Sequence, residues 1–135
     1  MRRVVITGMG IVSSIGNNTQ EVLASLREAR SGIIAAPRYA ELGFRSQIHG
    51  EPTLDPSEIV DRRAMRFHAQ GTAWNHVAMD QAILDSGLEE KDISNERTGI
   101  IMGSGGPSAR TLVESADIAR EKGPKRVGPF AVPKS

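Results

Sequence analysis

The sequence contains no cysteine, and this absence excludes disulfides, thiolate metal ligands and a cysteine nucleophile from these 135 residues. Charge is nearly balanced, with 17 basic and 16 acidic side chains, so no overall field draws the chain to nucleic acid or to a membrane surface. No apolar run approaches the ~18–20 residues of a membrane-spanning helix, and the run in MRRVVITG is too short for a signal peptide. We therefore expect a soluble, cytoplasmic protein whose partners include neither nucleic acid nor a membrane.

Aromatic residues are also scarce, at 4% of the chain, whereas glycine is abundant, with 14 residues. This balance favours tight turns between strands and helices over a large aromatic core. In the opening stretch VVITGMGIVSSIGNN, residues 4–18, the first four side chains are all β-branched and predict a strand buried on both faces. Asn18, with Glu21 three residues on, predicts the capping box of a helix that Gly32 ends.

The glycines of this stretch match part of the dinucleotide-binding fingerprint, G-x-G-x-x-G. Gly8 and Gly10 fit its first two positions, whereas Ser13 occupies the third. The second strand that should follow, ending in an acidic residue that binds ribose, is interrupted by the proline of SGIIAAPRYAEL. A second glycine turn at residues 103–106 lacks the lysine of a P-loop. A nucleotide-binding oxidoreductase domain is therefore the weaker interpretation of the opening turn.

The middle of the chain predicts irregular surface structure at residues 33–57, with a short strand near 45–49, and then one long helix. That helix runs from about Ile59 to Ser86, with Gly87 as its C-cap. Between residues 74 and 84 its apolar side chains occupy nearly every side, and only His76 and Asp80 form a contiguous polar strip. Such a helix is typical of a protein interior. This chain has little material to cover it, so we expect more protein to surround it.

The stretch TGIIMGSGG, residues 98–106, repeats the opening pattern of a strand followed by glycines. Pro107 suits the first turn of the helix that follows, and Gly123 with Pro124 ends that helix. The tail KRVGPFAVPKS is apolar and lacks a polar cap, which is typical of a boundary inside a domain rather than at its end.

The three histidines, His49, His68 and His76, form neither an H-x-x-x-H pair nor an HExxH motif. No carboxylates lie beside them at the spacing of metal ligands, so surface or hydrogen-bonded histidines are the better interpretation. We predict no metal site and no cofactor, and VSSIG lacks the G-x-S-x-G elbow of a serine nucleophile.

Two clusters of basic residues are more informative. Arg62, Arg63 and Arg66 are spaced so that they share one helical face, and Asp61 is the only acid beside them. A second cluster, Lys122, Lys125 and Arg126, lies about Gly123 and Pro124. A solvated face is the simpler explanation of one charge run, but two clusters on a nearly neutral protein favour docking of an acidic partner. Guanidinium groups bind carboxylates and phosphates equally well, so the charges alone do not choose between them.

Five motifs in one order resemble the start of the β-ketoacyl-acyl-carrier-protein synthases, and most closely the type I condensing enzymes of bacterial fatty acid synthesis. The motifs are VVITGMGIVSSIGNN, LREARSGI, DRRAMRF, IIMGSGG and KRVGPFAVPKS. The resemblance covers residues 1–135 but only about the opening third of such an enzyme. It implies an α/β chain with the thiolase-like fold, which has five αβαβα layers when complete and is present here as an incomplete N-terminal half. The opening turn would then join a strand to a helix and bind no phosphate.

The resemblance also implies an acyltransferase that condenses an acyl group with malonyl-acyl carrier protein in a decarboxylating Claisen reaction. It implies that the complete enzyme is a homodimer. The family's catalytic cysteine and two histidines lie beyond Ser135, so no catalytic residue is assigned here and this chain alone is expected to be inactive. Acyl carrier protein is the implied partner, and the residues matched to its docking surface are Arg62, Arg63, Arg66, Lys125 and Arg126. Gly106 and Pro107 match the acyl-pocket region, although related enzymes often have glycine in place of Pro107. The alternative is a non-catalytic subunit that binds the carrier or sets chain length.

Overall fold

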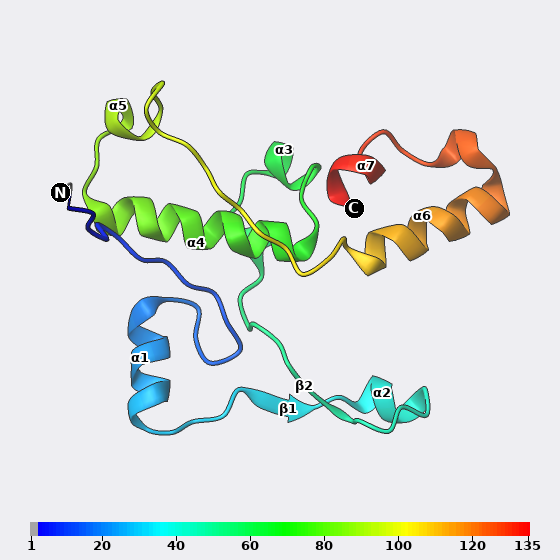
Figure 1. Ribbon diagram of the computed structural model, residues 1–135. Helices are drawn as coiled ribbons and strands as arrows, with labels where there is room; N and C mark the ends of the chain where they lie inside the picture. Colours follow the sequence, from blue (N-terminus) through cyan, green and yellow to red (C-terminus); the bar gives the residue numbers. More distant parts are fainter. Residues whose placement is uncertain (1–2) are drawn as a thin grey trace. The chain divides into compact units, whose positions relative to one another are not determined.

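The computed structural model describes residues 3–135 and divides into two compact units (Figure 1). The first contains the residues up to Asp55 together with Val77–Leu88, and the second contains Pro56–His76 with Glu89–Ser135. Helix α4, Gln70–Ser86, contributes residues to both units.

The first unit begins with a capped helix, as the sequence predicts. Helix α1 is Thr19–Arg27, and the Asn18 side chain accepts a hydrogen bond from the Glu21 backbone N–H at 2.9 Å. The Glu21 carboxylate accepts in return from the backbone N–H of Asn17 at 2.8 Å, one residue earlier than in a standard capping box. The predicted end at Gly32 is wrong. Ala29, the residue after the C-cap Glu28, adopts φ 52° and closes the helix with a Schellman pattern of hydrogen bonds.

A small hairpin follows α1. Strand β1, Ile33–Ala35, pairs antiparallel with β2, Ile48–Gly50, in the register Ile34 opposite His49. The intervening residues include helix α2, Pro37–Glu41. The predicted short strand near residues 45–49 is therefore confirmed, slightly later in the chain, as β2. Strand β1 and helix α2 lie in the part of this stretch that the sequence predicts to be irregular, so that part of the prediction is wrong. An isolated strand has unsatisfied backbone groups, and β1 supplies the partner that satisfies β2.

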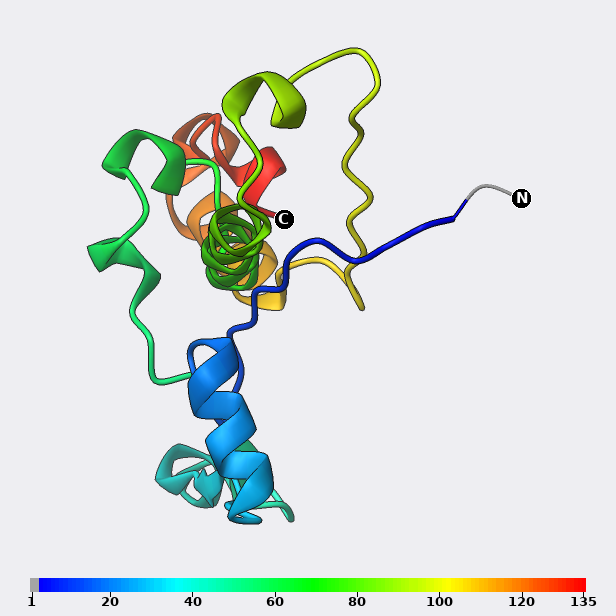
Figure 2. The same cartoon turned by 90° about the vertical axis from the view of Figure 1, so that its left-hand side faces the viewer.

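No strand is assigned to residues 4–7 or 98–102, although the sequence predicts buried strands there. Val4 is 93% exposed and Ile101 is 99% exposed. The blue N-terminal segment is drawn as plain coil along its described length up to α1 (Figure 2). A buried parallel strand needs a paired neighbour and a cover on each face, and the described residues provide neither for these segments.

The second unit is helical. It starts with the 3₁₀ turn η1, Pro56–Glu58, and the single-turn helix α3, Arg62–Met65. After α4 come three helices and one further 3₁₀ turn: α5, Glu90–Ile93; α6, Ala109–Lys122; η2, Pro124–Arg126; and α7, Ala131–Lys134. Ser108 caps α6 by accepting from the Thr111 N–H, so Pro107 lies before the cap and not in the first turn.

The predicted helix from Ile59 to Ser86 is wrong as one continuous element. It is divided into α3 and α4, and residues 66–69 connect them with short turn hydrogen bonds. Asp61 begins α3 by accepting from two backbone N–H groups, which fixes a separate helix start. The predicted C-terminal ends of the two long helices are confirmed. Gly87, at φ 65°, follows α4, and Gly123, at φ 84°, follows α6.

Few side chains are buried in either unit. Among the described residues the buried apolar positions are Ala36, Pro56, Val60, Ala73 and Val77. Leu84 on α4 is 84% exposed, although the composition of this helix is that of an interior one. The sequence-based expectation that α4 needs further protein around it agrees with this exposure.

Candidate functional site

The opening glycine turn packs on α4, and two of its backbone N–H groups donate to side chains of that helix. The backbone N–H of Met9 donates to the Asp85 carboxylate at 2.9 Å, and that of Ile11 donates to the Gln81 side-chain oxygen at 3.1 Å. Phosphate-binding turns hold their ligand with backbone N–H groups of this kind. Because α4 side chains already accept from two of them, the turn is architectural, as the resemblance implies.

Gly8 and Gly10 lie against the helix backbone itself. A Cβ atom at Gly10 would contact the Ala78 carbonyl group and would lie 2.8 Å from the Ala82 amide nitrogen. A Cβ atom at Gly8 would lie 2.7 Å from the Ser86 amide nitrogen. The two glycines are therefore required by the close approach of two backbones, which is a packing role.

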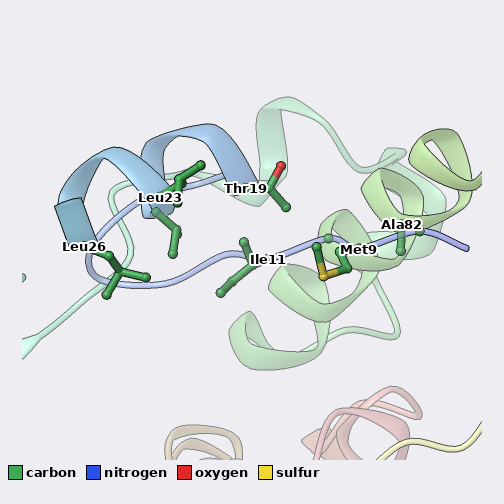
Figure 3. A pocket seen from close by; sticks show the side chains of 9 residues that line it. Met9, Ile11, Thr19, Leu23, Leu26 and Ala82 are labelled. Atoms are coloured by element: carbon green, nitrogen blue, oxygen red, sulfur yellow. The ribbon is translucent and has the colours of Figure 1, made fainter. Parts of the chain in front are cut away.

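An open apolar cavity of about 600 Å³ lies beside this turn (Figure 3). Leu23 and Leu26 come from α1, Met9 and Ile11 from the opening segment, and Ala82 from α4. Thr19 provides the only side-chain hydroxyl in the lining, and no charged residue lines it. The cavity therefore offers an apolar contact surface and lacks the cations that a nucleotide phosphate would need.

The first predicted basic cluster lies on and just after α3. Arg62, Arg63 and Arg66 are all exposed, and among the described residues none of their guanidinium groups forms an ion pair. The neighbouring Asp61 carboxylate accepts from the Arg63 N–H at 2.7 Å and from the Ala64 N–H at 3.3 Å. The Asp61 carboxylate thus caps the helix and forms no ion pair with the three arginines.

The second predicted cluster lies about η2. Lys125 and Arg126 belong to this turn, and Lys122 is the last residue of α6. All three are exposed, and none of them forms an ion pair within the part of the chain that the structure describes. A short turn with a proline at its start presents these charges on a backbone of restricted conformation.

One aromatic pair connects the segments that carry these two clusters. Phe67 directly follows Arg66, and its ring contacts that of Phe130 edge to face, with centroids 5.1 Å apart. Phe130 lies between η2 and α7, and Figure 1 shows α3 and α7 in the same part of the second unit. The structure thus brings both basic segments together in one unit, although some sixty residues separate them in the sequence.

Gly106 and Pro107 are placed elsewhere. Both are exposed, and Gly106 belongs to a loop in which the Ser104 hydroxyl donates to the Gly106 carbonyl oxygen at 2.6 Å. Neither residue lines the apolar cavity, and an added Cβ at Gly106 would meet no atom within 4 Å. Their predicted acyl-pocket role is not tested by these contacts.

Sequence reasoning missed a contact between two histidines. His68 Nε2 lies 3.2 Å from His76 Nδ1, and both side chains are half-buried. Their spacing of eight residues matches no metal or catalytic motif, and only the break between α3 and α4 brings them together. No group of three or more potential metal ligands occurs within residues 3–135, and no helix in this range is long and apolar enough to cross a membrane.

Comparison with known proteins identifies the class. The family model described as "Beta-ketoacyl synthase, N-terminal domain" matches residues 1–135. The chain therefore belongs to the family of β-ketoacyl synthase N-terminal domains.

The curated relatives are more specific. The chain is 46% identical to the 3-oxoacyl-(acyl-carrier-protein) synthase 1 of Haemophilus influenzae and 49% identical to that of Escherichia coli, with all of this chain and 34% of each relative covered. It is 34% identical to the 3-oxoacyl-(acyl-carrier-protein) synthase 2 of Vibrio harveyi, with 98% of this chain and 32% of the relative covered. The chain thus spans about a third of the length of these proteins.

Two solved structures match the fold. The structure titled "The ishigamide ketosynthase/chain length factor" superposes with a TM-score of 0.83 at 27% identity, over 98% of this chain and 34% of that one. A β-ketoacyl synthase from Burkholderia phymatum gives a TM-score of 0.78 at 24% identity, over 97% of this chain and 33% of that one. These matches show the thiolase-like fold, of which the chain covers about a third. The five-layer packing of the complete fold stays a prediction.

Proposed function

We propose that this chain is the N-terminal part of a β-ketoacyl-acyl-carrier-protein synthase, and that its own contribution to function is to dock the acyl carrier protein. The observation that carries the docking role is the presence of two unpaired, exposed basic clusters on segments joined by the Phe67–Phe130 contact. The high identity to synthases named for an acyl-carrier-protein substrate supports the identity of the partner.

In the proposed reaction an acyl group moves from its carrier to a cysteine thiolate. Malonyl on a second carrier then loses CO₂, and the resulting carbanion attacks the thioester. A thiolate needs a lowered pKa, and the developing enolate and oxyanion need hydrogen-bond donors. These residues contain no cysteine to form that thioester, so we propose that the chain alone is inactive and that residues outside it supply the chemistry.

We further propose that the complete protein is a cytoplasmic homodimer and that the loop about Gly106 and Pro107 lines its acyl pocket. The resemblance in IIMGSGG and VGPFAVPKS supports both proposals. Light scattering on the complete protein would measure the mass of the assembly directly, and a monomer would contradict the dimer.

The docking proposal predicts a large effect of charge reversal in the complete enzyme. Each exposed ion pair contributes about 0.2–1 kcal/mol, and reversal replaces attraction by repulsion. Changing Arg62, Arg63 and Arg66 to Glu together should raise the KM for acyl carrier protein by about 10- to 100-fold at low salt, with kcat within about twofold of wild type. The KM difference should shrink as salt is added, because surface charges are screened.

The matched control changes the same number of charges elsewhere. Arg27, Arg38 and Arg97 are exposed and belong to neither basic cluster. Their combined change to Glu alters the net charge equally and should leave the KM for the carrier within about threefold. Equal KM values for the two triple variants would refute a docking surface on α3.

A second candidate is a non-catalytic subunit that sets chain length. The solved structure with a TM-score of 0.83 names a chain length factor beside its ketosynthase, which favours keeping this candidate. The identity of 27% is well below the 46% and 49% shared with the two synthases. The residue at the nucleophile position of the complete protein decides, because cysteine there makes an enzyme and glutamine excludes the thioester step.

A further inference from the structure

Helix α3 is too short to hold its own orientation. It is a single turn of four residues, and an isolated turn is unstable because nucleation orders several residues for few hydrogen bonds. The bonds that continue the turn, from the N–H groups of Phe67 and His68 to carbonyls three residues earlier, are internal to this segment. The direction in which Arg62, Arg63 and Arg66 project therefore depends on side-chain contacts outside the turn.

The histidine pair provides one such contact. His68 lies two residues after Arg66, and its Nε2 atom is 3.2 Å from Nδ1 of His76. His76 lies on α4, three residues after Ala73, which is completely buried. The pair thus ties the end of the arginine segment to a fixed part of α4. One ring must donate and the other must accept, so the contact is directional.

Three consecutive residues then have different roles. Arg66 carries a charge of the docking surface, Phe67 contacts Phe130 on the segment after η2, and His68 contacts His76 on α4. Phe67 and His68 lie between an exposed cluster and two separate parts of the second unit. An arginine cluster held by both contacts meets its partner with less loss of conformational entropy than a freely moving one.

We propose that His68 and His76 are positioning residues for the carrier: their hydrogen bond fixes the orientation of the arginine-bearing turn relative to α4. This inference rests on the proposed docking function. The occupant of the surface is the same acidic protein, and the histidines act through Arg62, Arg63 and Arg66 without contacting it.

The test is made in the complete enzyme with variants that separate ring volume from hydrogen bonding. His76→Phe keeps a ring of similar size and removes the Nδ1 atom. His76→Asn keeps a polar atom near the Nδ1 position. His76→Phe should raise the KM for acyl carrier protein by about 3- to 10-fold with kcat within about twofold, and His76→Asn should restore most of the loss.

Two controls separate positioning from general damage. An acyl-pantetheine thioester has no carrier surface to dock, so its KM should be the same for wild type and His76→Phe. His49→Phe changes a histidine of the first unit and should leave the KM for the carrier unchanged. If His76→Phe reduces the yield of folded protein, His68→Phe with His68→Gln as its rescue repeats the test from the other side of the bond.

The outcomes separate the two proposals. If reversal of the three arginines raises the KM for the carrier but removal of either histidine does not, the positioning role is overturned and docking stands. If reversal of the arginines changes nothing, docking itself fails. A rise in KM for acyl-pantetheine equal to that for the carrier would also overturn the positioning role, because it would show a general structural defect.

Discussion

Replacing Gly10 by alanine tests most directly whether the opening turn is architectural. A Cβ at this position would contact the Ala78 carbonyl oxygen and would lie 2.8 Å from both the Ala78 carbonyl carbon and the Ala82 nitrogen. Real Cβ contacts essentially never fall under 3.0 Å, and these atoms belong to a helix backbone that cannot rotate away. The segment must therefore move off α4.

The expected loss in the free energy of unfolding follows from the overpacked contact and from the two neighbouring hydrogen bonds. Overpacking of a close-packed contact costs about 1–3 kcal/mol. Movement of the segment also weakens the hydrogen bonds from Met9 to Asp85 and from Ile11 to Gln81, each contributing about 0.5–1.5 kcal/mol. With both hydrogen bonds lost, Gly10→Ala should therefore lower the free energy of unfolding of the complete protein by about 2–6 kcal/mol.

Gly71→Ala is the matched control. Gly71 lies in the first turn of α4, and a Cβ there would meet no atom within 4 Å. Alanine is the better helix former, so this variant should be neutral or more stable by up to about 1 kcal/mol. Urea denaturation followed by circular dichroism gives both differences, provided that the m-values agree.

The result that would refute this reasoning is equal stability of the two alanine variants. The competing nucleotide interpretation makes a different prediction, in which Gly10→Ala abolishes NAD(P)H binding with little change in stability. A fluorescence titration of the wild-type protein with NAD(P)H should show no saturable binding, because α4 accepts from the Met9 and Ile11 N–H groups.

Two further predictions concern the isolated chain and the second glycine loop. Expressed alone, residues 1–135 should bind a hydrophobic dye strongly and give poorly dispersed amide signals, because the apolar side chains of residues 4–6 and 100–102 are exposed; a cooperative monomeric unfolding transition would contradict this. In the complete enzyme, Pro107→Gly should loosen the residue before the Ser108 cap and shift the acyl-length profile, whereas an unchanged profile would argue against an acyl-pocket role for this loop.

The sequence predicts local features of this fold well. Asn18 and Glu21 cap α1, and Gly87 and Gly123 follow α4 and α6, as expected. Each of these signals depends on a few neighbouring residues whose backbone donors or φ angle set a direct requirement. The Schellman end at Ala29 was not predicted, because alanine is an unusual residue at a positive φ.

The predicted strands depend on parts of a fold that lie far away in sequence. The β-branched residues 4–7 have the composition of a buried strand, but composition cannot supply a paired neighbour. These residues are exposed here, whereas Ile33–Ala35 forms a strand because Ile48–Gly50 lies beside it. Strand pairing, and not propensity, decides the assignment in both cases.

The candidate site also combines local features, which the sequence predicts, with a tertiary contact, which it does not. The spacing of Arg62, Arg63 and Arg66 predicts a shared face, and the absence of acids other than Asp61 predicts unpaired charge. Both properties are local. The structure shows the unpaired charge, because the three arginines are exposed and form no ion pair among the described residues, and the shared face stays a prediction. The joining of this cluster to Lys125 and Arg126 through Phe67 and Phe130 is a tertiary contact that no sequence spacing indicates.

The sequence does not predict the histidine contact, and it does not predict the break between α3 and α4. The contact depends on the break. On a continuous helix two residues eight positions apart are separated by about 12 Å along the axis, so the predicted helix from Ile59 to Ser86 excludes a bond between His68 and His76. The turn at residues 66–69 removes that separation and allows Nε2 to approach Nδ1 to 3.2 Å. The same turn frees α3 from the axis of α4, which is why the arginines need a side-chain tether. An uninterrupted helix would fix their direction through its own backbone and would make both histidines irrelevant to docking.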